Sequence, residues 1–385
     1  MRDVLRVALP LASMIFVLAA CGGASTQGHS GSSENQDSSR ARESTDASIV
    51  SGMSVNDMVG QMFVVSVGGT EPDYYIEKMV RERNIGGVIL FGYNMESEEQ
   101  VKSLTGSLQK VSLETEPAVP LFVAVDQEGG DIASVPWVAP EPPAAEIGRR
   151  GDPGEARAIA AMMGRQLLEA GINTDFAPVV DTGFGVAIGN RSYGEDPELV
   201  ARMGAAAVEG FEESGVISAA KHFPNHGPAT LDSHVSLPVI RHDAKTLHSY
   251  DLPPFEAAVE AGAPMVMVGH LLYPAIDPHN PASLSKDAIN ILRRDLGFDG
   301  VIVTDDLAMA GAKRGGTPAE AAVGAVEAGA DLLIVSSPLQ QQADAYDAVV
   351  AAVESGEIPR SRIRESVERV LGVKKTYDLR GAGRH

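Results

Sequence analysis

The chain has 385 residues, and its 52 Asp and Glu against 31 Lys and Arg give a formal net charge of −21. This balance argues against nucleic-acid binding, which needs a basic surface, and against a polybasic membrane patch. Hydrophobic residues make up 44% and charged residues 22%, which excludes a chain disordered throughout. Cys21 is the single cysteine, so a disulfide framework and a cysteine-rich zinc site are excluded as well.

Residues 1–20 have the features of an export signal. A basic start precedes an apolar run over residues 9–20, which is too short to span a bilayer. The run ends in LAACG at residues 18–22, which resembles the lipobox of bacterial lipoproteins. The resemblance implies cleavage before Cys21, a lipid on its thiol, and an exported protein anchored to the cell membrane. An ordinary secretory signal that contains a cysteine by chance is the alternative.

Residues 21–50 are predicted to be a flexible linker. They are rich in Gly, Ser, Asn and charged residues, and such a segment buries too little apolar surface to order itself. Residues 51–385 are expected to form one folded domain.

Short apolar segments alternate with longer helical ones from residue 54 onward. Strands are predicted at residues 62–67, 88–91, 121–125, 174–179, 216–220, 265–268, 301–304 and 332–335. Helices are predicted at residues 155–170, 197–214, 244–261, 318–328 and 358–373, several of them followed by glycine. Because the strands are apolar throughout, they fit a parallel sheet buried on both faces. Eight such units favour a TIM (β/α)8 barrel of the α/β class, with an open doubly wound sheet as the alternative.

Polar residues follow five successive strands. After these strand ends come, in chain order, Asp126, Asn190-Arg191-Ser192 in the loop beyond its strand, Lys221-His222, His270 and Asp305-Asp306. In a barrel these ends meet at one face, where active sites are built. The pattern therefore predicts a functional site at that face.

Five motifs in these segments carry a family resemblance. They are DQEGG at 126–130, GNRSYG at 189–194, KHFPNHG at 221–227, DSH at 232–234 and TDDLAM at 304–309. Together they resemble glycoside hydrolase family 3, in its branch of bacterial β-N-acetylglucosaminidases of the NagZ type. The resemblance implies a TIM barrel, retention of anomeric configuration, a covalent glycosyl intermediate and no metal or organic cofactor.

The resemblance also implies the catalytic groups. Asp305 matches the nucleophile, whereas Asp306 is expected to cap the following helix. Asp232 and His234 match an Asp-x-His dyad, in which the imidazole is the acid/base and the carboxylate orients it. Taken alone, such a dyad can also be an ordinary exposed turn.

Four residues match family positions that contact the sugar: Asp126, Arg191, Lys221 and His222. Two other interpretations stay open from the residues themselves. Lys221 could form a Schiff base, as in aldolase-like barrels. The nearby histidines and Asp232 could bind a metal, although no helix-spaced ligand pair is present.

The sequence departs from the family at three positions. Asp131 and Ser134 stand where the family has arginines, and Asn225 stands where it has glycine. Because a lost guanidinium removes a fixed cationic fork, sugar affinity and specificity are the properties these changes affect.

These observations predict a hydrolase that removes terminal β-linked N-acetylglucosamine, with peptidoglycan fragments as the expected carbohydrate partners. One alternative is a lipid-anchored sugar-binding or sensor protein without turnover. Another is a β-glycoside phosphorylase that uses the same residues, since an imidazole tolerates phosphate where a carboxylate repels it.

Overall fold

The computed structural model describes residues 49–313, 315–336 and 338–380. The predicted signal, Cys21 and almost all of the predicted linker lie outside these residues. None of the helices in the described ranges is both long enough and apolar enough to cross a membrane.

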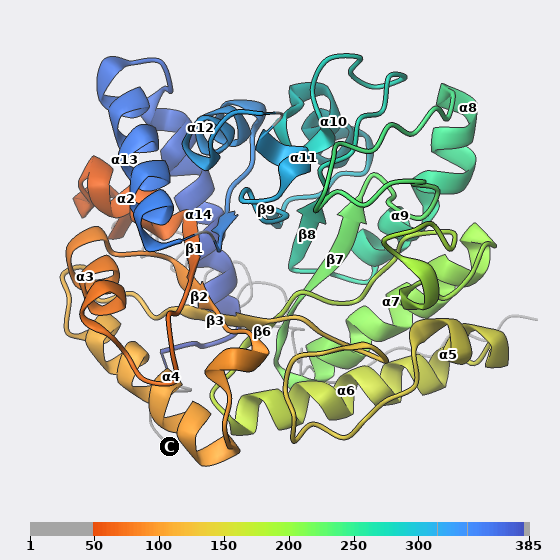
Figure 1. Ribbon diagram of the computed structural model, residues 1–385, viewed down its shortest axis with the longest axis horizontal. Helices are drawn as coiled ribbons and strands as arrows, with labels where there is room; N and C mark the ends of the chain where they lie inside the picture. The colour runs from red at the N-terminus through yellow and green to blue at the C-terminus, as the bar shows by residue number, and fades with distance from the viewer. Residues whose placement is uncertain (1–48, 314, 337, 381–385) are drawn as a thin grey trace, which may run out of the picture. The chain divides into compact units, whose positions relative to one another are not determined.

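Eight parallel strands form one curved sheet, and helices lie around it (Figure 1). The strands are β1 (Phe63–Ser66), β2 (Gly87–Ile89), β3 (Phe122–Val125), β6 (Thr174–Asp175), β7 (Ile217–Phe223), β8 (Met265–Val268), β9 (Val301–Thr304) and β10 (Leu333–Val335). Their order is β10-β1-β2-β3-β6-β7-β8-β9, so that sequential strands are neighbours. A parallel bridge between Val303 and Leu332 joins β9 to the start of β10 and completes the ring. The predicted TIM barrel is confirmed, and the open doubly wound sheet is wrong.

Larger helices lie before, between and after these strands, and those between two strands return the chain to the start of the next one. They are α2 (Val55–Gln61), α3 (Tyr74–Arg83), α4 (Glu98–Leu113), α5 (Ala144–Arg150), α6 (Pro153–Glu169), α7 (Pro197–Ser214), α9 (Pro253–Glu260), α10 (Lys286–Asn290), α12 (Pro318–Ala328), α13 (Leu339–Ser355) and α14 (Arg360–Thr376). The predicted bounds of α7 and α12 are confirmed. Both helices end at a glycine in the left-handed region, Gly215 and Gly329, as the sequence suggested.

The predicted continuous helix over residues 244–261 is wrong. The chain forms a short α8 (Ala244–Thr246), a π-helical segment (Leu247–Asp251) and then α9, which begins at Pro253. Proline lacks the backbone N–H that a helix interior needs but is tolerated in the first turn, so Pro253-Pro254 starts a new helix.

The core has an inner and an outer part. Inside the barrel, alternate strand residues pack on one another, among them Val64, Ile89, Phe122, Met267 and Val303. The other strand residues, such as Val65 and Val88, face the surrounding helices. Because every strand is buried on both faces, only the residues at strand ends can meet solvent or a ligand.

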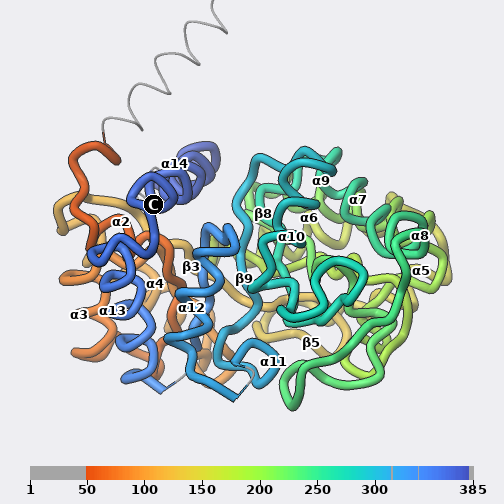
Figure 2. The backbone as a smooth tube through the Cα atoms, turned by 90° about the horizontal axis from the view of Figure 1, so that it is seen from above, coloured from red at the N-terminus to blue at the C-terminus, as the bar shows by residue number. Residues whose placement is uncertain are grey.

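Two further features lie outside the repeated strand–helix pattern. The last helix, α14, packs against α2, so the ends of the described chain lie together (Figures 1 and 2). After β3, a small hairpin of β4 (Gln127–Gly129) and β5 (Ile132–Ala133) rises from the barrel. Gly129 and Gly130 have φ of 88° and 59°, which lets the chain turn tightly there.

Candidate active site

A cavity of about 420 Å³ lies where the carboxyl ends of the strands meet. The predicted site residues that line it are Asp126, Arg191, Lys221, His222, His234 and Asp305. Asp232 reaches it through a hydrogen bond to His234. Apolar side chains, including Phe91, Phe176 and Met267, complete the wall. The predicted site residues thus come together at one face of the barrel, from segments that are far apart in the sequence.

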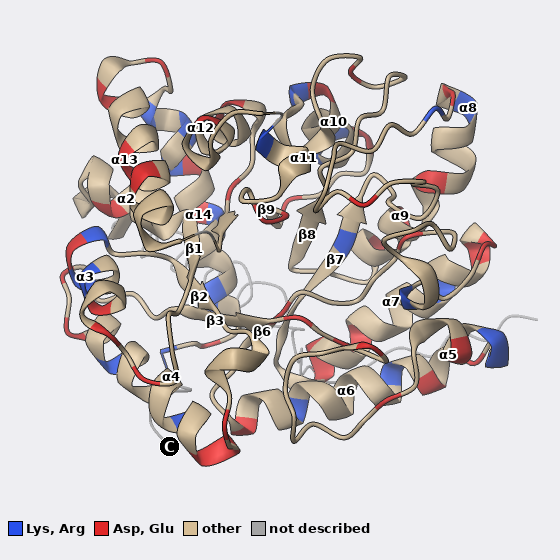
Figure 3. Ribbon diagram, viewed as in Figure 1, with Lys and Arg blue, Asp and Glu red and all other residues tan. Residues whose placement is uncertain are grey.

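Lys221 is the buried cation of the cavity. It is the only Lys or Arg of β7, seen as the blue band on that strand in Figure 3, and it is 2% exposed. Its Nζ lies 2.5 Å from Asp126 Oδ1 and 2.7 Å from Glu128 Oε1. Burial acts to lower the pKa of Lys221, but the two carboxylates outweigh burial and raise it. A Schiff-base lysine needs a neutral amine, so these contacts favour an ion-paired role instead.

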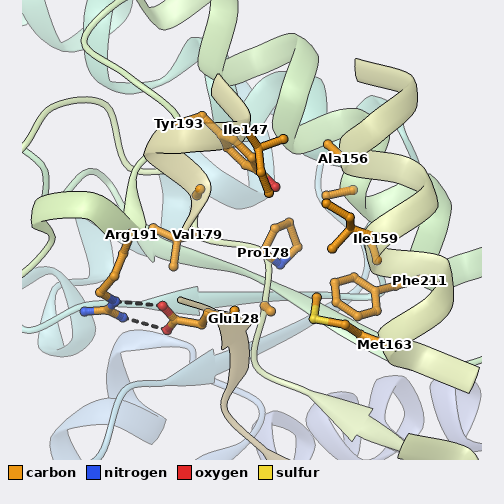
Figure 4. Close-up of a pocket in the computed structure, with 15 residues that line it drawn as sticks. Glu128, Ile147, Ala156, Ile159, Met163, Pro178, Val179, Arg191, Tyr193 and Phe211 are labelled. Carbon is orange, nitrogen blue, oxygen red and sulfur yellow. Dashed lines mark hydrogen bonds and ion pairs between the residues drawn. The ribbon is translucent and has the colours of Figure 1, made fainter. Parts of the chain in front are cut away.

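Arg191 is held by the same Glu128. The guanidinium forms a two-pronged ion pair, with Nε and Nη2 each 2.7 Å from a Glu128 oxygen (Figure 4). Burial acts to raise the pKa of Glu128, yet Lys221 and Arg191 hold it at about 2. Glu128 is not among the site residues predicted from the sequence. Its spacing of two residues from Asp126 was the available signal, because alternate residues of an extended segment share a face.

His222 and His226 are organised by Asp181. The Asp181 carboxylate accepts hydrogen bonds from His222 Nδ1 at 2.7 Å and from the backbone N–H of His226 at 2.6 Å. Burial raises the pKa of Asp181 to about 6 and keeps the pKa of His222 well below its usual value. His222 is therefore neutral and presents Nε2 as an acceptor, 3.5 Å from Arg191 Nη2. Asp181 is not among the predicted site residues, although it follows the strand predicted at residues 174–179.

The Asp305-Asp306 turn follows β9. The backbone N–H of Asp306 donates to Asp305 Oδ1 at 2.8 Å, and the Asp306 carboxylate accepts from the backbone of Ala308 and Ser336. His270 donates from Nε2 to the Asp306 carbonyl at 2.9 Å. Burial acts to raise the pKa of Asp305, but His270 and the Asp306 N–H lower it overall. Asp305 is thus an ionised, fixed carboxylate, and Asp306 holds the turn.

The Asp232–His234 pair occurs as predicted. His234 Nδ1 lies 2.7 Å from Asp232 Oδ1, and the His234 side chain is 68% exposed. Ser233, between them, is buried. Its Oγ lies 2.9 Å from His226 Nε2, and its carbonyl accepts from the N–H of Gly311. Ser233 therefore fixes the loop while its neighbours stay accessible.

The structure shows the surroundings of the three residues at which the sequence differs from the family pattern. Asp131 accepts a hydrogen bond from Asn190 at 3.0 Å, and Ser134 lines the cavity without supplying a charge. The Asn225 side chain accepts from the N–H of Thr182 and Gly227 and donates to Asp251. Asn225, at the position where the resemblance leads one to expect glycine, thus makes three buried hydrogen bonds.

Within the described ranges, no group of three or more His, Cys, Asp or Glu side chains has a metal-binding arrangement.

Comparison with known sequences places the chain among glycosidases. The profile of the glycosyl hydrolase family 3 N-terminal domain matches residues 54–373. Beta-hexosaminidase A of Pseudoalteromonas piscicida is 34% identical over 327 residues, which are 78% of this chain and 54% of that protein. A Beta-hexosaminidase of Stenotrophomonas maltophilia is 37% identical over 287 residues, 72% of this chain and 84% of that protein. The chain thus spans about half the length of the first relative and most of the second.

Comparison with solved structures gives the same family. A family 3 β-N-acetylglucosaminidase from Paenibacillus sp. superposes with a TM-score of 0.82 at 39% identity, over 86% of this chain and 64% of that one. A β-N-acetylhexosaminidase from Beutenbergia cavernae superposes with a TM-score of 0.78 at 31% identity, over 84% of this chain and 99% of that one. The predictions of the family and of an enzyme related to β-hexosaminidases are confirmed. The chain belongs to glycoside hydrolase family 3.

Proposed function

We propose that this chain is a retaining β-N-acetylglucosaminidase that removes terminal β-linked N-acetylglucosamine. One observation carries the proposal: an ionised, fixed Asp305 and an accessible His234, hydrogen-bonded to Asp232, line the same cavity. The names of the relatives support the choice of sugar.

In the first step, the Asp305 carboxylate attacks the anomeric carbon, and a glycosyl ester forms as the bond to the leaving oxygen breaks. His234, in its imidazolium form, gives its proton to that oxygen. Asp232 accepts a hydrogen bond from Nδ1, which leaves Nε2 as the proton-transferring atom.

In the second step, neutral His234 takes a proton from water. The hydroxide equivalent attacks the anomeric carbon, and the ester bond to Asp305 breaks. Two inversions give net retention, and Asp305 and His234 return to their starting states.

The buried ionic cluster supplies the sugar contacts. Asp126 and the neutral His222 are acceptors for sugar hydroxyls. Lys221 and Arg191 are donors, and Glu128 fixes the positions of both. Because these groups are already paired within the protein, binding requires little reorganisation.

We further propose export, a lipid on Cys21, and peptidoglycan fragments as substrates. The lipobox-like segment at residues 18–22 supports this, because a surface anchor would hold the enzyme near polymers that contain β-linked N-acetylglucosamine. Labelled palmitate should enter the wild-type chain in a bacterial host but not Cys21→Ser. Equal labelling of both would exclude the anchor.

The activity is tested on a chromogenic N-acetyl-β-glucosaminide with the domain from residue 49. Hydrolysis is expected, with no rate increase on adding phosphate. Phosphate-dependent release of a sugar phosphate would identify the phosphorylase instead. Binding without turnover, unchanged in His234→Ala, would identify the sensor.

A further inference from the structure

We propose that Tyr93, stacked on Phe91, forms a second sugar subsite beside the cavity and binds the pyranose ring attached to the leaving oxygen. The inference rests on the proposed function. It names the aglycone as a saccharide, which agrees with peptidoglycan fragments as substrates. We call the two stacked rings the aromatic platform.

The aromatic platform stands at the edge of the cavity. Phe91 lines the cavity. The ring of Tyr93 stacks on that of Phe91, with 5.7 Å between the ring centroids and 22° between the ring planes. Tyr93 is not among the residues that line the cavity, and it is 59% exposed. Its exposed surface therefore extends the wall of the cavity outward.

A buried amide fixes the loop that carries the platform. This loop is a short 3-10 helix, Gly92–Asn94, which follows β2. The fully buried Asn94 accepts a hydrogen bond at Oδ1 from the N–H of Phe91 at 2.9 Å. Its Nδ2 donates to the carbonyls of Val67 and Gly69 at 3.0 and 2.7 Å. Because the loop is already ordered, a ligand that packs on Tyr93 loses little free energy to ordering it.

The hydroxyl of Tyr93 connects the platform to the turn of the nucleophile. It forms a hydrogen bond with the side chain of Ser66, the last residue of β1. Ser66 Oγ donates to the carbonyl of Ser336 at 3.3 Å. Ser336 lines the cavity, and its N–H donates to the Asp306 carboxylate at 3.0 Å. A chain of contacts thus links Tyr93 to the residue next to Asp305.

The order of the strands places the platform on the aglycone side of the cavity. The proposed sugar contacts Asp126, Arg191 and Lys221 come from β3, from the loop after β6 and from β7, whereas Asp305 follows β9. Beyond β9 the ring of strands continues with β10, β1 and β2. If the sugar hydroxyls face the first group and the anomeric carbon faces Asp305, the leaving oxygen points toward β10, β1 and β2. The platform lies at the ends of the last two.

The chemistry of the platform favours a sugar ring as the occupant. A pyranose presents C–H groups on its faces and hydroxyls around its edge. A fixed, exposed aromatic ring can cover such a face while the hydroxyls stay in water, and this combination of an apolar face and a polar edge matches that of tyrosine itself. A small alkyl aglycone is too short to reach beyond the cavity and gains nothing from the platform.

The test compares two glycosides with the same terminal sugar, the β-1,4-linked disaccharide of N-acetylglucosamine and methyl N-acetyl-β-glucosaminide. The quantity measured is the ratio of kcat/KM for the disaccharide to kcat/KM for the methyl glycoside within each protein, so that a general change in activity cancels. Tyr93→Ala should lower this ratio about fivefold, the effect of losing one aromatic stacking contact.

Two further variants separate stacking from other effects. Tyr93→Phe keeps the ring and should retain most of the wild-type ratio. Tyr74→Ala is the matched control, because Tyr74 is a tyrosine that is 82% exposed, begins α3 and is not among the residues that line the cavity. Its ratio should equal that of wild type.

An unchanged ratio in Tyr93→Ala would overturn the aromatic platform and leave the proposed function intact. Equal losses on both glycosides would do the same, because they would show that Tyr93 only supports the cavity wall. A wild-type protein that hydrolyses the methyl glycoside and not the disaccharide would also overturn the platform. Failure to hydrolyse even an aryl N-acetyl-β-glucosaminide would overturn the proposed function itself.

Discussion

The buried hydroxyl of Ser233 contacts His226, with Oγ 2.9 Å from Nε2, and this contact ties the loop of the proposed acid/base to the turn after β7. The carbonyl of the same serine accepts from Gly311, at the start of the segment after Asp305. One buried residue thus links the loop that holds the proton donor to the part of the chain that holds the nucleophile.

Ser233→Ala should therefore disturb proton delivery more than sugar binding. We expect kcat/KM to fall about tenfold for aglycones that are poor leaving groups, a fraction of what general acid catalysis contributes. The loss should be small for dinitrophenyl leaving groups, which depart without a proton. The measurement is a leaving-group series for wild type and variant.

Ser236→Ala, on the same loop, is the control and should follow wild type. An equal loss of activity across the whole leaving-group series in Ser233→Ala would show a general structural defect instead of misplaced acid/base chemistry.

The assignment of Asp305 and His234 predicts opposite products in azide. Asp305→Ala should lose about 10³-fold or more in kcat, and azide should then attack an activated substrate directly to give the α-glycosyl azide. His234→Ala still forms the glycosyl ester with an activated substrate, so azide should give the β-glycosyl azide. Proton NMR of the products distinguishes the two.

Asp306→Asn is the matched control for the nucleophile. It disturbs the turn through its contacts with Ala308 and Ser336, so it should lower activity without any rescue by azide. An α-glycosyl azide from Asp306→Asn, and none from Asp305→Ala, would exchange the two assignments.

Glu128 should make acid stability depend on its ion pairs. Its pKa is about 2 in the fold against an ordinary 4.5, so it stabilises the protein above about pH 4.5 and loses that contribution as pH falls toward 2. The shift corresponds to about 3 kcal/mol. Urea unfolding across this pH range should show that the free energy of unfolding falls more steeply in wild type than in Glu128→Gln.

Glu209→Gln serves as the control, because Glu209 forms an exposed ion pair with Arg157 that contributes little. If wild type and Glu128→Gln lost stability in parallel below pH 4.5, the buried ion pairs of Glu128 would not be the cause of the loss of stability in acid.

Asn225 should be a stabilising departure from the family. Asn225→Gly removes hydrogen bonds to Thr182, Gly227 and Asp251, and we expect the free energy of unfolding to fall by about 2–4 kcal/mol. Denaturant unfolding checks this. Asn190→Gly, which removes one exposed contact to Asp131, should cost well under half as much. Equal losses would mean that the buried network does not depend on Asn225.

The sequence predicted much of the barrel because its signals are local. Each strand is a short apolar run, and the bounds of α7 and α12 follow from Pro at the start and Gly at the end. The error at residues 244–261 also has a local cause. The spacing of apolar residues predicts one continuous helix, but Pro253-Pro254 marks the start of a separate helix within that range.

The partners within the site could not be predicted in the same way. Glu128 and Arg191 are 63 positions apart, and their ion pair depends on how the hairpin after β3 faces the loop after β6. From the sequence, Ser233 is one polar residue among others in an expected exposed turn. In the structure it is buried, whereas the side chains of its neighbours Asp232 and His234 are exposed. The direction in which these side chains point is set by contacts between loops that are distant in the sequence. The spacing of residues within one segment carries no information about such contacts.

The bridge between Val303 and Leu332 has a further consequence. It lies just before Asp305, and the backbone of Ser336, beyond β10, holds the Asp306 carboxylate. The last two strands, β9 and β10, must therefore pair before the nucleophile acquires its final position. During refolding, regained turnover should lag behind regained helical circular dichroism, so that the enzymatic rate reports the pairing of β10 with β9.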